Sequence, residues 1–224
     1  MMPPDKSQPN ESSNPYLPLL IDFSDKLVVI FGGGAVGERK AKRFCKKAPV
    51  TVVSSSLTAD LKKMETEDDF LFIQKDISKL TDGEIFDCIS DAFLVIAATS
   101  DSEINRKIVS MAKTAGILVN DTEGADEVVI PSFIERGGLQ IAVSSGGESP
   151  AVSKYARMKI ESVIGDDFEK MIELQSEMRE YLKTVEPDQN KRQEILWKIM
   201  NDEEIWKLLS VDFEKAKESA LKNI

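Results

Sequence analysis

The stretch VVIFGGGAVGERKAKRF, residues 28–44, decides the fold. A nearly continuous apolar run over 26–31 is typical of a strand buried on both faces of a parallel sheet, and a segment with helical spacing follows it. Between them, Gly32, Gly34 and Gly37 form a G-x-G-x-x-G motif. In this context the motif favours dinucleotide binding, because it allows a tight turn, a close approach to pyrophosphate and close packing of helix on strand. The helix N-terminus would receive the anion.

Strand and helix patterns alternate through the first half of the chain. Further strands are predicted over 50–55, 70–74, 92–99 and 117–120, and a helix over 102–116 that ends at Gly116. This alternation predicts an α/β fold with a Rossmann-like, doubly wound parallel sheet.

The pattern changes after about residue 126. Two strands joined through Glu135-Arg136-Gly137-Gly138 predict a hairpin within 126–150, and helical spacing continues over 151–224 with a break at Pro187. The nucleotide-binding domain is therefore expected at 16–125. Residues 1–15 are rich in Pro, Ser, Asn and charge, and are expected to be a disordered tail.

Composition narrows the function. The net charge of -10 argues against a nucleic-acid partner. Cys45 and Cys88 are the two cysteines and form no CxxC, so a reducing cytoplasm fits and no metal site is expected. No stretch approaches the ~20 apolar residues of a membrane span, and the start lacks the apolar core of a signal peptide. There are no histidines, so proton transfer falls to a carboxylate, Lys, Tyr, Cys, water or the substrate.

The identity of the dinucleotide depends on the end of the second strand. A carboxylate usually binds the adenosine ribose there, but this chain has Ser54-Ser55-Ser56. Hydroxyls can bond a ribose or a phosphate, so this chemistry alone leaves NAD and NADP open. No Arg follows directly to hold a 2′-phosphate, which favours NAD as the cofactor.

Four segments, in order, resemble one family. GGGAVGERKA is similar to the G-G-G-x-V-A-x-R-K-A of the precorrin-2 dehydrogenase family, which includes the N-terminal module of sirohaem synthases, and LPLLIDFSDKLVVIFGGG resembles its L-P-L-F-L-D-L start. VIAATSDSEINRKIV resembles its A-A-T-x-D-x-x-x-N segment. IPSFIERGGLQIAVSSGGESPAVSKYARMKIE resembles its block around S-T-G-G-x-S-P, which is much more specific than the glycine motif. The resemblance covers roughly residues 16–185.

The resemblance implies an activity and a set of cofactor contacts. Members remove hydrogen from precorrin-2, pass hydride to NAD and make sirohydrochlorin, and some also insert iron. They are homodimers joined through strands that correspond to about 126–145, and their final helices, here 151–224, cover the active-site cleft. The family positions imply that the following residues contact NAD: Gly32, Gly33, Gly34, Ala35, Val36, Ser55, Ser56, Thr99 and Asn120.

The resemblance also suggests a catalytic carboxylate. The family's general base is an Asp three residues after the Asn of V-N-x-x-D, and Glu123 has that place here. The loop from Asn120 to Pro131 is also about two residues shorter than in the family. Asp121 and Asp126 therefore compete with Glu123 for the role, and the departure puts iron insertion in doubt.

A substrate with many carboxylates needs a basic site. Arg136, Lys154, Arg157 and Lys159 cluster in the block after the parallel sheet and are expected to bind it. The alternative is that they form a solvated basic face. Ser145 matches a family position beside the tetrapyrrole. The chain carries no recognisable methyltransferase segment, so precorrin-2 would come from a separate protein.

Two other functions compete with this interpretation. Tyr155 and Lys159 form the Y-x-x-x-K pair of short-chain dehydrogenases, but those enzymes use a different glycine motif and an N-A-G where this chain has AATS. A regulatory module that binds NAD without catalysis would usually keep an acidic residue at the end of the second strand and has no need of SSGGESP.

Overall fold

The computed structural model describes residues 15–122 and 127–222. The tail expected at 1–15 therefore lies almost wholly outside the described residues. The chain forms two compact units, one ending at Ile130 and the other beginning at Pro131. The boundary expected from the sequence is a few residues earlier, at 125.

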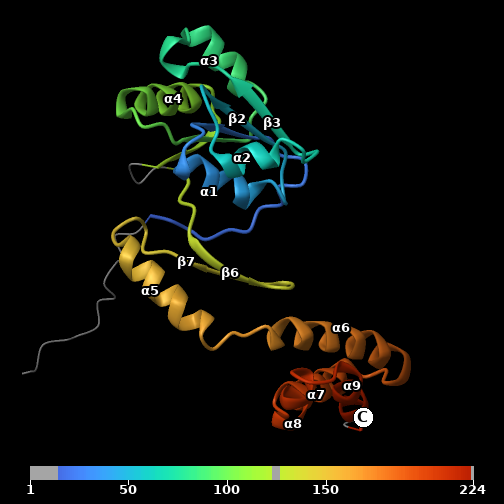
Figure 1. Cartoon of the computed structure of the whole chain (residues 1–224). Coiled ribbons are helices and arrows are strands. Elements are labelled where there is room, and N and C mark those ends of the chain that lie inside the picture. Colours follow the sequence, from blue (N-terminus) through green and yellow to red (C-terminus); the bar gives the residue numbers. More distant parts are fainter. Residues whose placement is uncertain (1–14, 123–126, 223–224) are drawn as a thin grey trace, which may run out of the picture. The chain divides into compact units, whose positions relative to one another are not determined.

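The first unit is built on a five-stranded parallel sheet with the strand order β3-β2-β1-β4-β5. Figure 1 labels β2 and β3 of this sheet together with the helices of the unit. Its strands are β1 (Val28–Phe31), β2 (Val50–Ser54), β3 (Phe70–Gln74), β4 (Leu94–Ala97) and β5 (Leu118–Asp121). Chain order reverses between β1 and β4, so this is the topological switch point of a doubly wound sheet. The predicted α/β fold is confirmed.

Helices cover both faces of this sheet, because β1 is apolar on both sides. Val28 and Ile30 pack in a core with residues of α1 and α2, whereas Val29 and Phe31 pack in a second core with residues of α3 and α4. All four side chains are fully buried. The helices are α1 (Ala35–Phe44), α2 (Ala59–Met64), α3 (Asp82–Ile89) and α4 (Ser102–Thr114), with a short 3-10 helix at Ile77–Lys79.

Two of these helices were not predicted, although each begins at a recognisable cap. Thr58 accepts a hydrogen bond from the Leu61 N–H at the start of α2. At the start of α3, Thr81 and Glu84 form a reciprocal capping box. Both helices are short, so apolar periodicity gives little signal for them.

The second unit contains a hairpin and a helical region. The predicted hairpin is confirmed: β6 (Ser132–Arg136) and β7 (Leu139–Val143) pair antiparallel across Gly137-Gly138. Gly137 has φ of +53°, and a positive φ at the first central residue is what glycine supplies in a two-residue hairpin turn. The helices are α5 (Pro150–Glu161), α6 (Asp167–Val185), α7 (Gln189–Met200), α8 (Glu203–Leu209) and α9 (Phe213–Leu221).

The helical region has its own core. Met171, Leu174 and Met178 of α6 pack against apolar residues of α7, α8 and α9 and are at most 1% exposed. Pro187 separates α6 from α7 as predicted. The pattern after it is divided into three helices, whose starts are capped by Asp188, Asp202 and Asp212. Within the described residues, no helix combines the length and the apolar character needed to cross a membrane.

Candidate nucleotide-binding site

A cavity of about 680 Å³ opens in the first unit, lined by the loops that follow β1, β2, β3 and β4. Its position at the carboxyl ends of the strands and at the switch point is where ligands bind in such sheets. The volume lies within the ~300–1,000 Å³ of ligand pockets. Apart from Asn120, all the predicted cofactor residues line it: Gly32, Gly33, Gly34, Ala35, Val36, Ser55, Ser56 and Thr99.

The glycines of the motif serve two different purposes. A Cβ at Gly32, where φ is +118°, would lie 2.3 Å from the Ala98 carbonyl oxygen, and a Cβ at Gly37 would lie 1.9 Å from the Gly32 carbonyl oxygen. These positions must be glycine for the backbone to pack. A Cβ at Gly34, by contrast, would meet no heavy atom of the described residues within 4 Å. Gly34 thus borders open space in the cavity, the space that a bound pyrophosphate would need.

The N-terminus of α1 has the features of an anion-binding site. Its N-cap is Gly34, so within the described structure no side chain caps the helix, whereas Thr58, Thr81 and Asp101 cap the other α-helices of this unit. The first-turn N–H groups and the positive end of the helix dipole are therefore left for a ligand. This is the arrangement that dinucleotide pyrophosphate recognition requires.

Asn105 fixes one wall of the cavity and was missed as a site residue. It is fully buried on α4. Its Oδ1 accepts hydrogen bonds from the Thr99 N–H at 3.0 Å and the Thr99 hydroxyl at 2.7 Å, and its Nδ2 donates to the Thr99 carbonyl at 3.1 Å. The signal was present, because Asn105 is the final residue of the A-A-T-x-D-x-x-x-N segment.

Asp76 supplies a carboxylate that the sequence analysis did not find. It follows β3, which is the neighbour of β2, and lines the cavity together with Ser55 and Ser56. Hydrogen bonds from Ser78, and then the Lys79 ammonium, lower the pKa of Asp76, so it is ionised at neutral pH. The carboxylate thus follows the third strand, whereas the sequence motif places it at the end of the second.

Asn120, which was predicted to contact the cofactor, makes hydrogen bonds within the first unit, and its contact with the cofactor stays a prediction. It is buried at the end of β5 and is not among the described residues that line the cavity. Its Oδ1 accepts a hydrogen bond from the Lys40 Nζ at 3.0 Å, and its Nδ2 donates to the Val128 carbonyl at 2.8 Å. Burial, and then Arg43 and Arg39, lower the pKa of Lys40 to about 8.

The predicted catalytic carboxylates lie in the segment that begins at the end of β5. Asp121 is the last residue of β5 and is partly exposed. Val128, beyond the segment, donates its N–H to the Val119 carbonyl at 3.3 Å, so the chain returns beside β5. Glu123 and Asp126 lie outside the described residues, and their role stays a prediction.

In the second unit, two of the predicted substrate-binding residues converge on a glutamate. Arg157 and Glu161 form an ion pair along α5, and Arg136 Nη2 of β6 lies 3.4 Å from Glu161 Oε1. Arg136 Nε also lies 3.2 Å from Asp166 Oδ1. The two guanidinium groups thus share one glutamate, and in this structure carboxylates of the chain itself pair with them. Their binding of substrate stays a prediction. Glu161 had not been singled out.

The other three predicted residues on this unit have separate surroundings. Lys154 is exposed on α5, and the exposed Lys159 places its Nζ 5.6 Å from the centre of the Tyr155 ring. Ser145 precedes α5, where its hydroxyl accepts from the Ser149 N–H and the Ser153 hydroxyl, each at 3.0 Å. Ser145 therefore builds the turn into α5.

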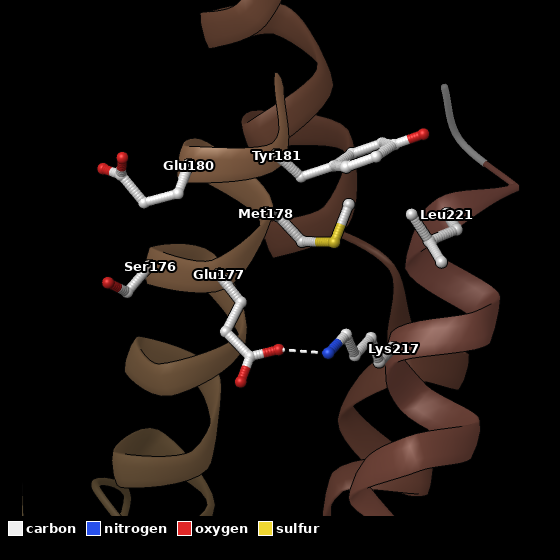
Figure 2. Close-up of a pocket in the computed structure, with 7 residues that line it drawn as sticks. All are labelled: Ser176, Glu177, Met178, Glu180, Tyr181, Lys217 and Leu221. Carbon is white, nitrogen blue, oxygen red and sulfur yellow. Dashed lines mark ion pairs between the residues drawn. The ribbon is translucent and has the colours of Figure 1, made fainter. Parts of the chain in front are cut away.

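A second cavity, of about 550 Å³, lies in the helical region between α6 and α9 (Figure 2). Glu177 Oε2 and Lys217 Nζ form an ion pair of 2.6 Å across it, with Met178, Tyr181 and Leu221 as its apolar wall. It contains none of the predicted site residues. Among the described residues no group of three or more Cys, Asp or Glu is placed to hold a metal ion.

Two family models match the chain, one over the first unit and one within the second. Residues 19–132 match a model described as putative NAD(P)-binding. Residues 136–162 match the central segment of sirohaem biosynthesis proteins. The first match spans the sheet and the cavity, and the second covers all of β7 and α5.

Three curated relatives show what this chain is similar to. A precorrin-2 dehydrogenase of Methanosarcina barkeri is 45% identical, over 93% of this chain and 93% of the relative. A putative precorrin-2 dehydrogenase of Methanocaldococcus jannaschii is 32% identical, over 89% and 97%. A sirohaem synthase of Mannheimia succiniciproducens is 30% identical over 75% of this chain but only 34% of its own length.

A solved structure has the same fold. The precorrin-2 dehydrogenase SirC superposes with a TM-score of 0.71 at 21% identity, covering 92% of this chain and 100% of that one. The likeness therefore extends from the parallel sheet through the hairpin into the helical region.

Proposed function

The chain belongs to the precorrin-2 dehydrogenase family, and we propose that it oxidises precorrin-2 to sirohydrochlorin with NAD as the hydride acceptor. The reaction balances as precorrin-2 and NAD⁺ giving sirohydrochlorin, NADH and a proton. The observation that carries the proposal is the cavity at the switch point, with open space at Gly34 and an α1 N-terminus that no described side chain caps. The enzyme names of the relatives favour catalysis over a regulatory module.

The residues of the cavity fit a dinucleotide. Gly34, Ala35 and Val36 would hold the pyrophosphate through backbone N–H groups, and Ser55 and Ser56 would contact the adenosine ribose. Thr99, fixed by Asn105, would border the nicotinamide half. When bound, NAD supplies the hydride acceptor.

The proton needs a second acceptor. A chain with no histidine leaves this task to a carboxylate, water or the substrate. We infer that a carboxylate of the segment after β5 takes it, with Glu123 first and Asp121 and Asp126 as alternatives. A base at the carboxyl end of β5 would come from the same sheet edge as the cofactor cavity.

The substrate's carboxylates need cations. Arg136 and Arg157 are the best candidates, because Glu161 already orients both guanidinium groups in one place. Binding would exchange Glu161 or Asp166 for a carboxylate of the substrate. Lys154 and Lys159 would add exposed positive charge, and Ser145 would shape the turn beside them.

The resemblance to the family supports a further proposal about assembly and location. We propose a homodimer that pairs through the β6–β7 hairpin and acts in the cytoplasm on precorrin-2 supplied by a methyltransferase. Light scattering of the purified protein tests the dimer, and a monomer at assay concentration would contradict it.

The direct test is an anaerobic turnover assay with precorrin-2. NADH and sirohydrochlorin should appear in equal amounts, and neither should appear when NAD⁺ is omitted. Sirohydrochlorin added to the protein should change its absorption spectrum, which a nucleotide sensor would not cause. A protein that binds NAD⁺ but neither turns over precorrin-2 nor perturbs the tetrapyrrole spectrum would be a regulatory module.

A further inference from the structure

The lining of the cavity is chemically varied. The glycine loop and the start of α1 offer backbone N–H groups, which suit a pyrophosphate. The lining also includes Ser54 at the end of β2, Ser55 and Ser56 after it, and Asp76 and Ser78 after β3. A dinucleotide with its pyrophosphate at α1 has its adenosine ribose at the end of β2, and β3, which Asp76 follows, is the neighbour of β2.

The carboxyl ends of β2 and β3 are held side by side by hydrogen bonds. Ser54 pairs with Gln74 in the sheet, and the Lys75 N–H donates to the Ser54 carbonyl at 2.9 Å. The Gln74 Nε2 donates to the Ser55 carbonyl at 3.3 Å. Asp76 is therefore held beside the serine run, one strand away from the position where Rossmann folds usually place their acid.

The Asp76 carboxylate is fixed and charged. Its Oδ1 accepts hydrogen bonds from the Ser78 N–H at 3.2 Å and the Ser78 hydroxyl at 2.7 Å, and its Oδ2 lies 3.1 Å from the Lys79 Nζ. Its side chain is 45% exposed, so it keeps lone pairs for a ligand. The pairing also neutralises Lys79, the cation nearest to this carboxylate.

We propose that Asp76 selects NAD over NADP, by accepting a hydrogen bond from the adenosine ribose and repelling a 2′-phosphate. This inference rests on the proposed function, since it assumes that the cavity holds the dinucleotide. A 2′-phosphate would bring about two negative charges next to a carboxylate, and like charges at short range oppose binding. The neutral serines at the end of β2 would accept either cofactor, so the discrimination falls to Asp76.

The test measures the dissociation constants of NAD⁺ and NADP⁺ for the full chain by calorimetry. The wild type should prefer NAD⁺. Asp76→Asn should reduce that preference by about tenfold or more, because it removes the repulsion and frees Lys79 to pair with the phosphate. Asp76→Ser should do the same while keeping a hydroxyl that caps Ser78, which separates the effect of charge from that of the turn.

Asp60→Asn is the matched control. Asp60 is also 45% exposed and paired with lysines, but it lies on α2 and is not among the described residues that line the cavity. Its loss should leave the ratio of the two constants unchanged. An unchanged ratio in both Asp76 variants, or a wild type that prefers NADP⁺, would overturn the inference while leaving dinucleotide binding intact. A wild type that binds neither nucleotide would overturn the proposed function as well.

Discussion

At the residue scale, Gly34 differs from the other glycines of its motif, because it borders the ligand cavity and is not required for backbone packing. Its neighbours Gly32, Gly33 and Gly37 are held by close backbone contacts, at which a Cβ would lie between 1.9 and 2.3 Å from a carbonyl oxygen. Gly34 has open space instead. The spacing of glycines in the sequence predicts the motif, but only the geometry shows which glycine can be changed without disturbing the fold.

Gly34→Asp should therefore fold normally and lose NAD binding, because its carboxylate would occupy and repel the pyrophosphate site. Gly83→Asp is a suitable control, since Gly83 also has open space and lies in the first turn of α3. Calorimetric titration with NAD⁺ measures the effect. Wild-type affinity in a folded Gly34→Asp protein would remove NAD from this cavity.

Asn105→Ala should lower the free energy of unfolding by about 1–3 kcal/mol, because it leaves the partly buried backbone groups of Thr99 without the partners that Asn105 supplies. It should also weaken NAD binding, since Thr99 lines the cavity. Urea unfolding and NAD⁺ titration measure the two effects. Ser110→Ala, at an exposed position of the same helix, should change neither. Loss of stability with full NAD affinity would show that Asn105 serves the fold alone.

Lys40 predicts a pH dependence of stability. Burial lowers its pKa from 10.5 to about 8 in the native state. Between these values the unfolded chain holds a proton that the native protein has released, so stability from this group rises with pH. The difference in unfolding free energy between wild type and Lys40→Met should therefore grow in favour of the wild type from about pH 7 to about pH 10. A constant difference would mean that Lys40 has an ordinary pKa.

Glu123→Gln should lower the rate of dehydrogenation by roughly 10²–10⁴-fold, as for a lost general base, with NAD affinity retained. Single-turnover kinetics with precorrin-2 measure this. If Asp121→Asn or Asp126→Asn loses the rate instead, the base is the neighbouring carboxylate. Full rates in all three variants would mean that water or the substrate takes the proton.

At the element scale, the strands that line the cavity could be predicted and the short helices could not. β1 and β2 are rich in apolar, β-branched residues, and this composition predicts strands that are buried on both faces. Helices α2 and α3 are too short for apolar periodicity, and their caps, Thr58 and Thr81 with Glu84, were the available signal. Asp76 was missed because strand adjacency, not sequence distance, brings β3 beside β2.

A cavity-creating mutation in the core of the helical region should destabilise that region and leave the nucleotide site unaffected. Leu174 is fully buried in the core that α6 forms with α7, α8 and α9. Leu174→Ala should therefore cost about 2–5 kcal/mol in the unfolding of this region. Ile172→Ala, partly exposed on the same helix, should cost less. NAD affinity should match the wild type in both variants, and its loss in Leu174→Ala would show that the cavity depends on this core.

At the scale of the whole molecule, the lining of the cavity was more predictable than the surroundings of the basic residues. The glycine loop, Ser55, Ser56 and Thr99 follow strands of one sheet, and the glycine motif, the strand pattern and the family resemblance pointed to them. The basic residues were predicted as a cluster, but the pairing of Arg136 and Arg157 with Glu161 depends on how β6 and α5 pack. Charge counted along a sequence does not reveal which cations the protein neutralises itself.

The most direct test of the account is the rate of NADH formation from precorrin-2 by wild type and Gly34→Asp, with Gly83→Asp as the control. One NADH should form for each sirohydrochlorin in the wild type and in Gly83→Asp, and no NADH should form in a folded Gly34→Asp protein. Sirohydrochlorin formed without NADH, or a Gly34→Asp protein that turns over at the wild-type rate, would contradict it.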